Sequence, residues 1–178
     1  MIFRELSLSG AYEITLEKHS DTRGFFARMY CAREFADLGL NTEWVQMNLS
    51  FNAHAGTLRG MHFQRAPLAE IKLVRAVRGR VMDVIIDLRD GSQTYGKHIE
   101  IILDSDHGNA IYIPKGFAHG FQSLTDATEL LYAHSTPYTP GHEGGINALG
   151  LGINWPLQPQ NMSPRDRALG PLSECPAL

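Results

Sequence analysis

Cysteine is scarce in this sequence, which has two cysteines, Cys31 and Cys175, among 178 residues. Two cysteines so far apart cannot build the disulfide framework of a small secreted domain, and they lack the close spacing of zinc ligands. The simplest interpretation is a pair of free thiols in the reducing cytoplasm. The N-terminus also lacks the long apolar stretch of a signal peptide, so we expect no export.

Long apolar runs and an excess of positive charge are missing as well. Apolar runs such as Val84–Ile86 and Ala110–Ile113 are far too short to cross a bilayer. Lysine and arginine total 16 against 19 acidic residues, which gives a net charge of −3, and the cations are scattered. Nucleic-acid surfaces usually show clustered cations, so we expect neither a nucleic acid nor a membrane as a partner.

The sequence does contain a succession of short apolar runs separated by turn residues. Its length suits one sizeable core, so we expect a single domain over residues 1–178. Residues 81–88 alternate between two faces, and Asp83 shares one face with Val81 and Ile85. Such alternation is typical of a β-sandwich or barrel. We expect strands over 72–77, 81–88, 98–103, 110–113, 120–124 and 128–134, the first two paired as a hairpin around Gly79.

Helical signals are few. Residues 33–38 can form a short helix that Gly39 ends in a left-handed conformation. Ser163, Pro164 and Asp166 follow the order of a helix start, with a capping serine, a proline in the first turn and an acid at the third position. From about residue 168 the chain carries two prolines and a glycine, and there we expect a loose tail.

Two stretches concentrate residues that carry chemistry: Gly56–Gln64, followed by Lys72 and Gly79, and Pro114–Phe121. The second fits the Pro-x-Gly-x-x-His pattern of the cupins. The first resembles the other cupin pattern, in which two histidines and a glutamate bind a metal, but Gln64 stands at the second histidine and Lys72 at the glutamate. Glutamine is a poor ligand for transition metals and an ammonium group is not a ligand. We therefore expect no metal and no other cofactor, with the positive charge of Lys72 in the metal's place.

Further motifs make the resemblance specific. From about residue 3 to residue 167 the chain resembles the dTDP-4-dehydrorhamnose 3,5-epimerase family. The motifs are Asp21-x-Arg23-Gly24-Phe25-Phe26, Gln46-x-Asn48-x-Ser50, Leu58–Gln64, Lys72–Arg75, Asp83-Val84, Asp87–Arg89, Tyr112–Phe121, Tyr132 and Trp155-Pro156. The resemblance implies an all-β, cupin-type double-stranded β-helix (jelly-roll) barrel with a few short helices. It also implies an isomerase that acts on C3 and C5 of a nucleotide-linked 4-keto-6-deoxy sugar.

The resemblance assigns catalytic roles to four residues. A ketone at C4 acidifies the protons on C3 and C5, so the enzyme needs a base, a group that stabilises the enolate oxygen, and an acid on the opposite face. His62 matches the base, since its reference pKa of about 6.5 lies near the working pH. Asp166 matches the carboxylate that orients this base, although it also stands where a capping-box acid would. Lys72 matches the oxyanion stabiliser and Tyr132 the acid, with Tyr138 as the competing choice.

Eight residues are expected to bind the substrate: Arg23, Phe26, Arg28, Gln46, Asn48, Arg59, His119 and Tyr138. The planar guanidinium groups of Arg23 and Arg59 suit diphosphate oxygens. Family members usually carry a glutamate where this chain has Arg28, and a guanidinium can donate hydrogen bonds but not accept them. The nucleotide therefore stays open among dTDP, CDP and GDP, with Arg28 as an alternative phosphate ligand. Asp83 is expected to pair with Lys72 or His119.

Other functions stay open at this point. The same groups suit an epimerase that acts on one carbon, or a 3,4-ketoisomerase. A metal-dependent cupin is disfavoured by Gln64 and Lys72, and a non-catalytic sugar-nucleotide-binding cupin by the presence of His62, Lys72 and Tyr132 together. The expected partners are a nucleotide-diphospho sugar and, from the resemblance, a second copy in a homodimer that exchanges N-terminal strands. Most other histidines, among them His134, are expected at the surface.

Overall fold

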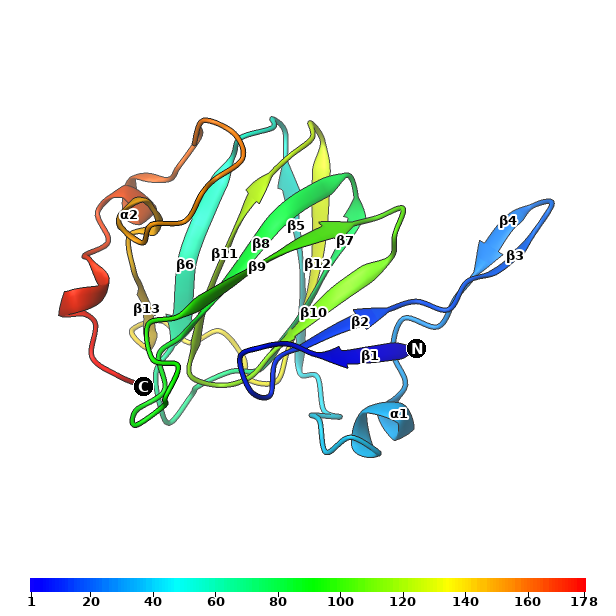
Figure 1. Cartoon of the computed structure of the whole chain (residues 1–178), viewed down its shortest axis with the longest axis horizontal. Coiled ribbons are helices and arrows are strands. Elements are labelled where there is room, and N and C mark those ends of the chain that lie inside the picture. Colours follow the sequence, from blue (N-terminus) through cyan, green and yellow to red (C-terminus); the bar gives the residue numbers. More distant parts are fainter.

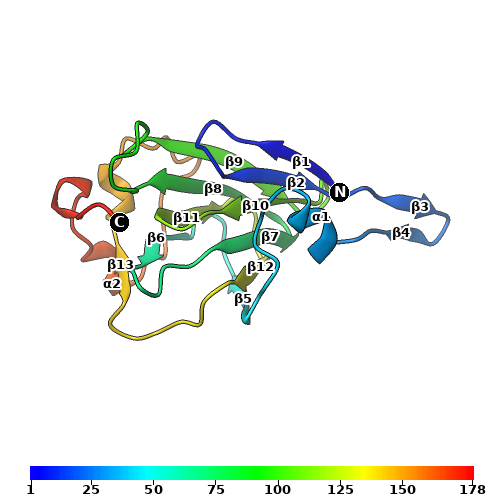
Figure 2. The same ribbon diagram turned by 90° about the horizontal axis from the view of Figure 1, so that it is seen from below.

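Alternating apolar residues build two β-sheets that pack face to face, as Figures 1 and 2 show for this computed structural model of residues 1–178. No helix is long and apolar enough to cross a membrane. The strands are β1 (Ile2–Glu5), β2 (Tyr12–Thr15), β3 (His19–Asp21), β4 (Gly24–Phe26), β5 (Gln46–Asn52), β6 (Leu58–Gln64), β7 (Lys72–Arg78), β8 (Arg80–Asp87), β9 (His98–Asp104), β10 (Asn109–Ile113), β11 (Phe117–Ser123), β12 (Thr128–His134) and β13 (Glu143–Gly145). The helices are α1 (Ala32–Ala36) and α2 (Pro164–Arg167), with 3-10 turns η1 (Ala148–Gly150) and η2 (Leu172–Glu174).

The sheets have the antiparallel arrangement of a jelly roll. One has the strand order β1-β2-β10-β7-β12-β5 and the other β13-β6-β11-β8-β9. The predicted alternation along β8 is confirmed: Val81 and Ile85 pack in the core between the sheets, whereas Val84 and Ile86 pack in a second core on the other face. The all-β, cupin-type class expected from the sequence is thereby confirmed.

The predicted hairpin around Gly79 is wrong. β7 pairs with β10 and β12, whereas β8 pairs with β11 and β9 in the opposite sheet. Gly79 has a φ of +72°, and a Cβ there would lie 2.5 Å from Thr125 Oγ1. The glycine therefore marks a tight corner, but a tight corner alone does not say whether the chain returns within one sheet or crosses to the other. That choice depends on which faces find apolar partners.

The C-terminal segment differs from the loose tail expected from the sequence. The backbone N–H of Leu178 donates to the carbonyl of Leu88 at 2.7 Å, and the carbonyl of Leu178 accepts from Asp90 at 3.0 Å. Leu172 and Leu178 pack against the outer core of the five-stranded sheet. In Figure 1 this red segment lies beside β6 and β13. Burial of these leucine side chains holds the segment against the sheet, although its prolines and glycine suggested a mobile tail.

Strands β3 and β4 form a hairpin that projects away from the two sheets (Figure 1, right). Its pairing is confined to the two strands themselves. Phe26, the last residue of β4, is 78% exposed. Its neighbour Phe25 is 57% exposed, so the hairpin presents two large and mostly uncovered aromatic side chains, which indicates a contact surface.

An irregular register in the β6–β11 pair orients the residues of the cavity described below. His62 lies opposite His119, and Arg59 lies opposite Phe121. Three steps along β6 thus correspond to two steps along β11, so Arg59 and His62 approach the same side of the sheet despite their odd spacing. The extra residue is accommodated at Gly60, where the backbones of β6 and β11 come very close.

Replacing Gly60 with alanine is expected to destabilise the fold by roughly 2–5 kcal/mol. Its φ is +111°, and a Cβ would lie 2.6 Å from Gly120 Cα and 2.7 Å from the His119 carbonyl oxygen, both of them backbone atoms that cannot rotate away. Urea denaturation measures the change. Gly91→Ala is the matched control, because Gly91 has a φ of +67° but open space around it, so it should cost about 1 kcal/mol. Equal losses in the two variants would contradict the steric argument.

Candidate active site

A cavity of about 290 Å³ lies between the two sheets. Six of the residues predicted for the site line it together: Asn48, Arg59, His62, Lys72, His119 and Tyr132. The first sheet contributes β5, β7 and β12, and the second contributes β6 and β11. Residues far apart in sequence therefore meet because inward-facing positions alternate along each strand.

His62 forms a short hydrogen bond with Asp166, whose carboxylate is buried. The distance between His62 Nε2 and Asp166 Oδ1 is 2.7 Å, and Asp166 Oδ2 accepts from the backbone N–H of Gly60 at 3.2 Å. The helix cap uses a different part of the residue: the backbone N–H of Asp166 donates to Ser163 Oγ at 3.0 Å. The two roles considered for Asp166 are therefore compatible, since the carboxylate serves His62 while the amide completes the cap.

The surroundings keep His62 neutral. Burial lowers its pKa below the ordinary value, the hydrogen bond and charge of Asp166 oppose this effect, and the positive charges of Lys72 and Arg165 add to it. Because Nε2–H donates to the carboxylate, Nδ1 is left with the free lone pair. The side chain is 37% exposed and faces the cavity. A neutral, oriented imidazole of this kind can accept a proton from a bound molecule.

Tyr132 lies across the cavity from this pair, on β12. Burial raises the pKa of its phenol, and the negative charge of Asp83 raises it further. The phenol therefore stays protonated and can act as an acid. Asp83 is fully buried, and its Oδ2 lies 2.7 Å from His119 Nε2, so the predicted pairing of Asp83 is with His119. Tyr132 lines the cavity, whereas the competing Tyr138 is not among its lining residues.

Lys72 brings a positive charge into the cavity from β7. Its Nζ lies 3.1 Å from Glu70 Oε1 and 3.5 Å from the carbonyl oxygen of His62. Gln64, at the other degenerate cupin position, does not line the cavity. Its Oε1 instead accepts from the backbone N–H of Thr139 at 2.9 Å, which ties down the loop around Tyr138. No group of three histidine, cysteine, aspartate or glutamate side chains is placed to hold a metal ion.

Five of the predicted binding residues are not among the residues that line the cavity. Arg23 pairs with Asp21 on the projecting hairpin, and Arg28 pairs with Glu34. Gln46 lies at the start of β5, and its Oε1 accepts a hydrogen bond from the backbone N–H of Tyr138 at 3.0 Å. The five residues are Arg23, Phe26, Arg28, Gln46 and Tyr138. Within one chain, therefore, the hairpin residues are not brought together with the others.

Several residues of the cavity were not predicted. Ser50 and Phe121 line it, and so does His134, which is 8% exposed rather than at the surface as expected. Strand alternation was the signal that identifies two of them, because Ser50 is two residues after Asn48 and His134 two residues after Tyr132. Glu70, which bonds His134, precedes β7 and carries no such signal.

Comparison with known proteins identifies the family. The family model for dTDP-4-dehydrorhamnose 3,5-epimerase matches residues 5–174. The chain is 39% identical over 183 residues to a dTDP-4-dehydrorhamnose 3,5-epimerase of Sinorhizobium fredii, covering 99% of this chain and 92% of that one. It is also 39% identical over 170 residues to a dTDP-4-dehydrorhamnose 3-epimerase of Streptomyces niveus, covering 94% and 82%.

A solved structure agrees with these sequences. The dTDP-4-dehydrorhamnose 3,5-epimerase of Bacillus anthracis, with TDP and PPi bound, matches with a TM-score of 0.93 and 35% identity over 96% of this chain and 98% of that one. The predicted enzyme class, a sugar epimerase among the isomerases, is confirmed at this level. The chain belongs to the dTDP-4-dehydrorhamnose 3,5-epimerase family.

Proposed function

We propose that the protein epimerises C3 and C5 of dTDP-4-dehydro-6-deoxyglucose. The observation that carries this proposal is the presence, around one cavity, of a neutral histidine held by a carboxylate, a lysine, and a tyrosine that stays protonated. These are the base, the oxyanion stabiliser and the acid that a stepwise inversion next to a ketone requires. A binding protein without catalysis would not need all three.

The chemistry follows from these positions. His62 Nδ1 removes the proton from C3 or C5, and the electron pair of the C–H bond moves to form an enolate at C4. The ammonium group of Lys72 stabilises the negative oxygen. Tyr132 then donates its proton to the opposite face of the same carbon, and the electron pair on oxygen returns to restore the ketone. His62 and Tyr132 exchange protons with solvent before the next turnover, so solvent hydrogen enters the product.

Incubation in deuterated water tests the proposal. Both C3 and C5 of the product should carry deuterium. Deuterium at C3 alone would indicate a 3-epimerase instead. The chain is 39% identical both to the Sinorhizobium fredii 3,5-epimerase and to the Streptomyces niveus 3-epimerase, so sequence identity does not separate the two activities. If neither C3 nor C5 took up deuterium, epimerisation would be rejected altogether.

The nucleotide is proposed to be dTDP. The TDP in the related Bacillus anthracis structure supports this nucleotide. Arg28 argues against it, because a guanidinium group, unlike a carboxylate, cannot accept a hydrogen bond from a base N–H. Competition between dTDP, CDP and GDP for the site measures the preference directly. A preference for CDP or GDP of more than tenfold would overturn the proposed nucleotide and leave the proposed reaction intact.

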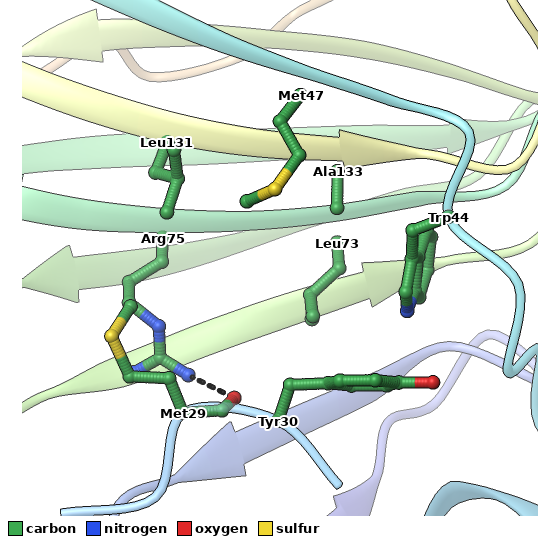
Figure 3. A pocket seen from close by; sticks show the side chains of 8 residues that line it. All are labelled: Met29, Tyr30, Trp44, Met47, Leu73, Arg75, Leu131 and Ala133. Carbon is green, nitrogen blue, oxygen red and sulfur yellow. Dashed lines mark hydrogen bonds between the residues drawn. The ribbon is translucent and has the colours of Figure 1, made fainter. Parts of the chain in front are cut away.

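We further infer a cytoplasmic homodimer in which the hairpin residues Arg23 and Phe26 reach the partner's cavity. Two surfaces support the dimer. The projecting hairpin has few contacts of its own, and the outer face of β5 exposes Met47, Leu49 and Phe51. An apolar recess of about 120 Å³ lies beside this face. Figure 3 shows the residues that line it, which are Met29, Tyr30, Trp44, Met47, Leu73, Arg75, Leu131 and Ala133. Burying such a patch in a dimer is favourable.

Mixing two inactive variants tests the shared site. Arg23→Ala and His62→Asn should each be inactive alone, and a co-refolded mixture should regain up to about a quarter of the activity per chain because one site of each mixed dimer is intact. Light scattering should give twice the chain mass of 19.8 kDa. A monomeric mass, or no recovery in the mixture, would contradict the shared site.

The pH profile of kcat/KM is expected to fall only on the acid side within the neutral range. The base must be neutral, and burial lowers the pKa of His62, so activity should be lost as pH drops through a value below about 6.5. No loss should occur up to about pH 9, because burial raises the pKa of Tyr132. Asp166→Asn removes a contact that raises the pKa of His62, so its acid limb should move to lower pH. A limb that moves to higher pH would contradict the assignment.

A further inference from the structure

Three histidine–carboxylate pairs surround the cavity, and the proposed mechanism gives a role to only one of their histidines. His62–Asp166, His119–Asp83 and His134–Glu70 each have a nitrogen–oxygen distance of 2.7 Å. In the third pair, His134 lies on β12, in the sheet that carries Lys72 and Tyr132, and Glu70 lies just before β7. His134 lies directly opposite Lys72 in the β12–β7 register.

Glu70 connects this pair to the group that stabilises the enolate. One carboxylate oxygen lies 2.7 Å from His134 Nδ1, and the other lies 3.1 Å from Lys72 Nζ. All three side chains are about 10% exposed. Burial would raise the pKa of Glu70, but the hydrogen bond from His134 and the charge of Lys72 outweigh it and hold the pKa below its ordinary value. A charged carboxylate thus joins both side chains at the cavity wall.

The contact with Glu70 also fixes which nitrogen of His134 carries the proton. A carboxylate can only accept, so Nδ1 must donate and Nε2 is left with a lone pair. The side-chain amide nitrogen of Asn48 lies 3.3 Å from Nε2, as a donor to that lone pair should. The ring stacks on Tyr132 with the planes 13° apart. His134 therefore presents a rigid hydrogen-bond acceptor to the cavity, close to Lys72.

We propose that the C3 hydroxyl group of the substrate displaces the side-chain amide of Asn48 from His134 Nε2 and donates a hydrogen bond to that nitrogen, and that Glu70 is a positioning residue for His134 and Lys72. The assignment to C3 rests on the proposed function: if Lys72 faces the C4 oxygen, the neighbouring acceptor meets a substituent next to the ketone. Of the two carbons beside C4, only C3 carries a hydroxyl group, whereas C5 carries a methyl group. His134 would thus distinguish C3 from C5, the two carbons next to the ketone.

Glu70→Gln is the decisive variant, because it keeps the shape and reverses the polarity. The glutamine amide can donate to Nδ1, so the proton of His134 would move to Nε2 and the acceptor would become a donor. Nitrogen-15 NMR of histidine-labelled protein should show Nδ1–H in the wild type and Nε2–H in the variant, assigned by loss of the signal in His134→Phe. Glu129→Gln is the control. Glu129 lies on β12, as His134 does, but its only ion pair is a long one of 3.9 Å with the exposed Arg78.

Turnover gives the second readout. Glu70→Gln and His134→Phe should each lower kcat/KM about tenfold to a hundredfold, because a buried polar group of the substrate loses its partner. The loss in the double variant should fall well short of the product of the two single losses, since both variants remove the acceptor at His134 Nε2 and only Glu70→Gln also removes the negative charge beside Lys72. Binding of dTDP alone should change less than twofold. With a 3-deoxy substrate, His134→Phe and wild type should exchange deuterium at C5 at similar rates.

Two results would overturn the inference: an Nε2–H signal for His134 in the wild type, or a His134→Phe variant that folds and discriminates against the 3-deoxy substrate as strongly as the wild type does. His134→Gln, which keeps a polar side chain, replaces His134→Phe if that variant does not fold. Failure of the proposed function would look different, because the wild type would then exchange no deuterium at C3 or C5 while the NMR tautomer result would be unaffected.

Discussion

Replacing His62 with asparagine is expected to lower kcat by about 10²- to 10⁴-fold, the contribution typical of a positioned general base. The amide of asparagine cannot accept a proton at neutral pH. Asp166 would lose its 2.7 Å contact with the imidazole but keep the backbone N–H of Gly60 as a donor, so the fold should survive. Deuterium exchange at C3 and C5 should fall in parallel with turnover, because proton removal precedes both.

Two comparisons sharpen this prediction. His54→Asn makes the same chemical change at an exposed histidine outside the cavity and should leave kcat within about twofold. Tyr132→Phe should suppress product formation more strongly than exchange, because it removes the acid and leaves the base. If His62→Asn kept more than a tenth of the wild-type exchange rate, another group would have to be the base.

Replacing Lys72 with methionine is expected to lower kcat by about 10²- to 10³-fold, the effect measured when one oxyanion donor is removed from comparable sites. Methionine keeps the length and the apolar stem of the side chain but has no charge. The enolate oxygen would then lie in a buried cavity without its counter-charge, where an unpaired anion is costly. Since the enolate is common to exchange and epimerisation, both rates should fall by the same factor.

The control for this variant is Lys115→Met, at an exposed lysine in the turn between β10 and β11. It should have kcat and a melting temperature close to those of the wild type. If Lys72→Met instead raised KM tenfold with kcat unchanged, Lys72 would bind the ground state and the enolate equally well. The role assigned to it here would then be wrong.

Much of the cavity wall could be predicted from strand patterns and motif residues. Tyr132 lies on the strand expected over 128–134, whereas Asn48 was identified by its motif and lies on β5, a strand that was not expected; both face inward. The same alternation indicates that His134 faces inward too, yet as an isolated histidine it gave no reason to expect burial. Its acceptor role depends on Glu70, which lies 64 residues away in sequence. No local pattern predicts such a pair.

The amino-acid sequence by itself determined the side-chain chemistry, the strand faces, the helix cap at Ser163 and the family, because each depends on residue type or on spacing within a few residues. Tertiary structure decided which strands pair, as the chain's crossing at Gly79 shows. It also brought Arg59 and His62 to one side through the irregular register at Gly60, and it left Arg23 and Phe26 outside their own cavity. These features depend on the packing of surfaces distant in sequence, where the burial of whole faces, rather than any local preference, selects the arrangement.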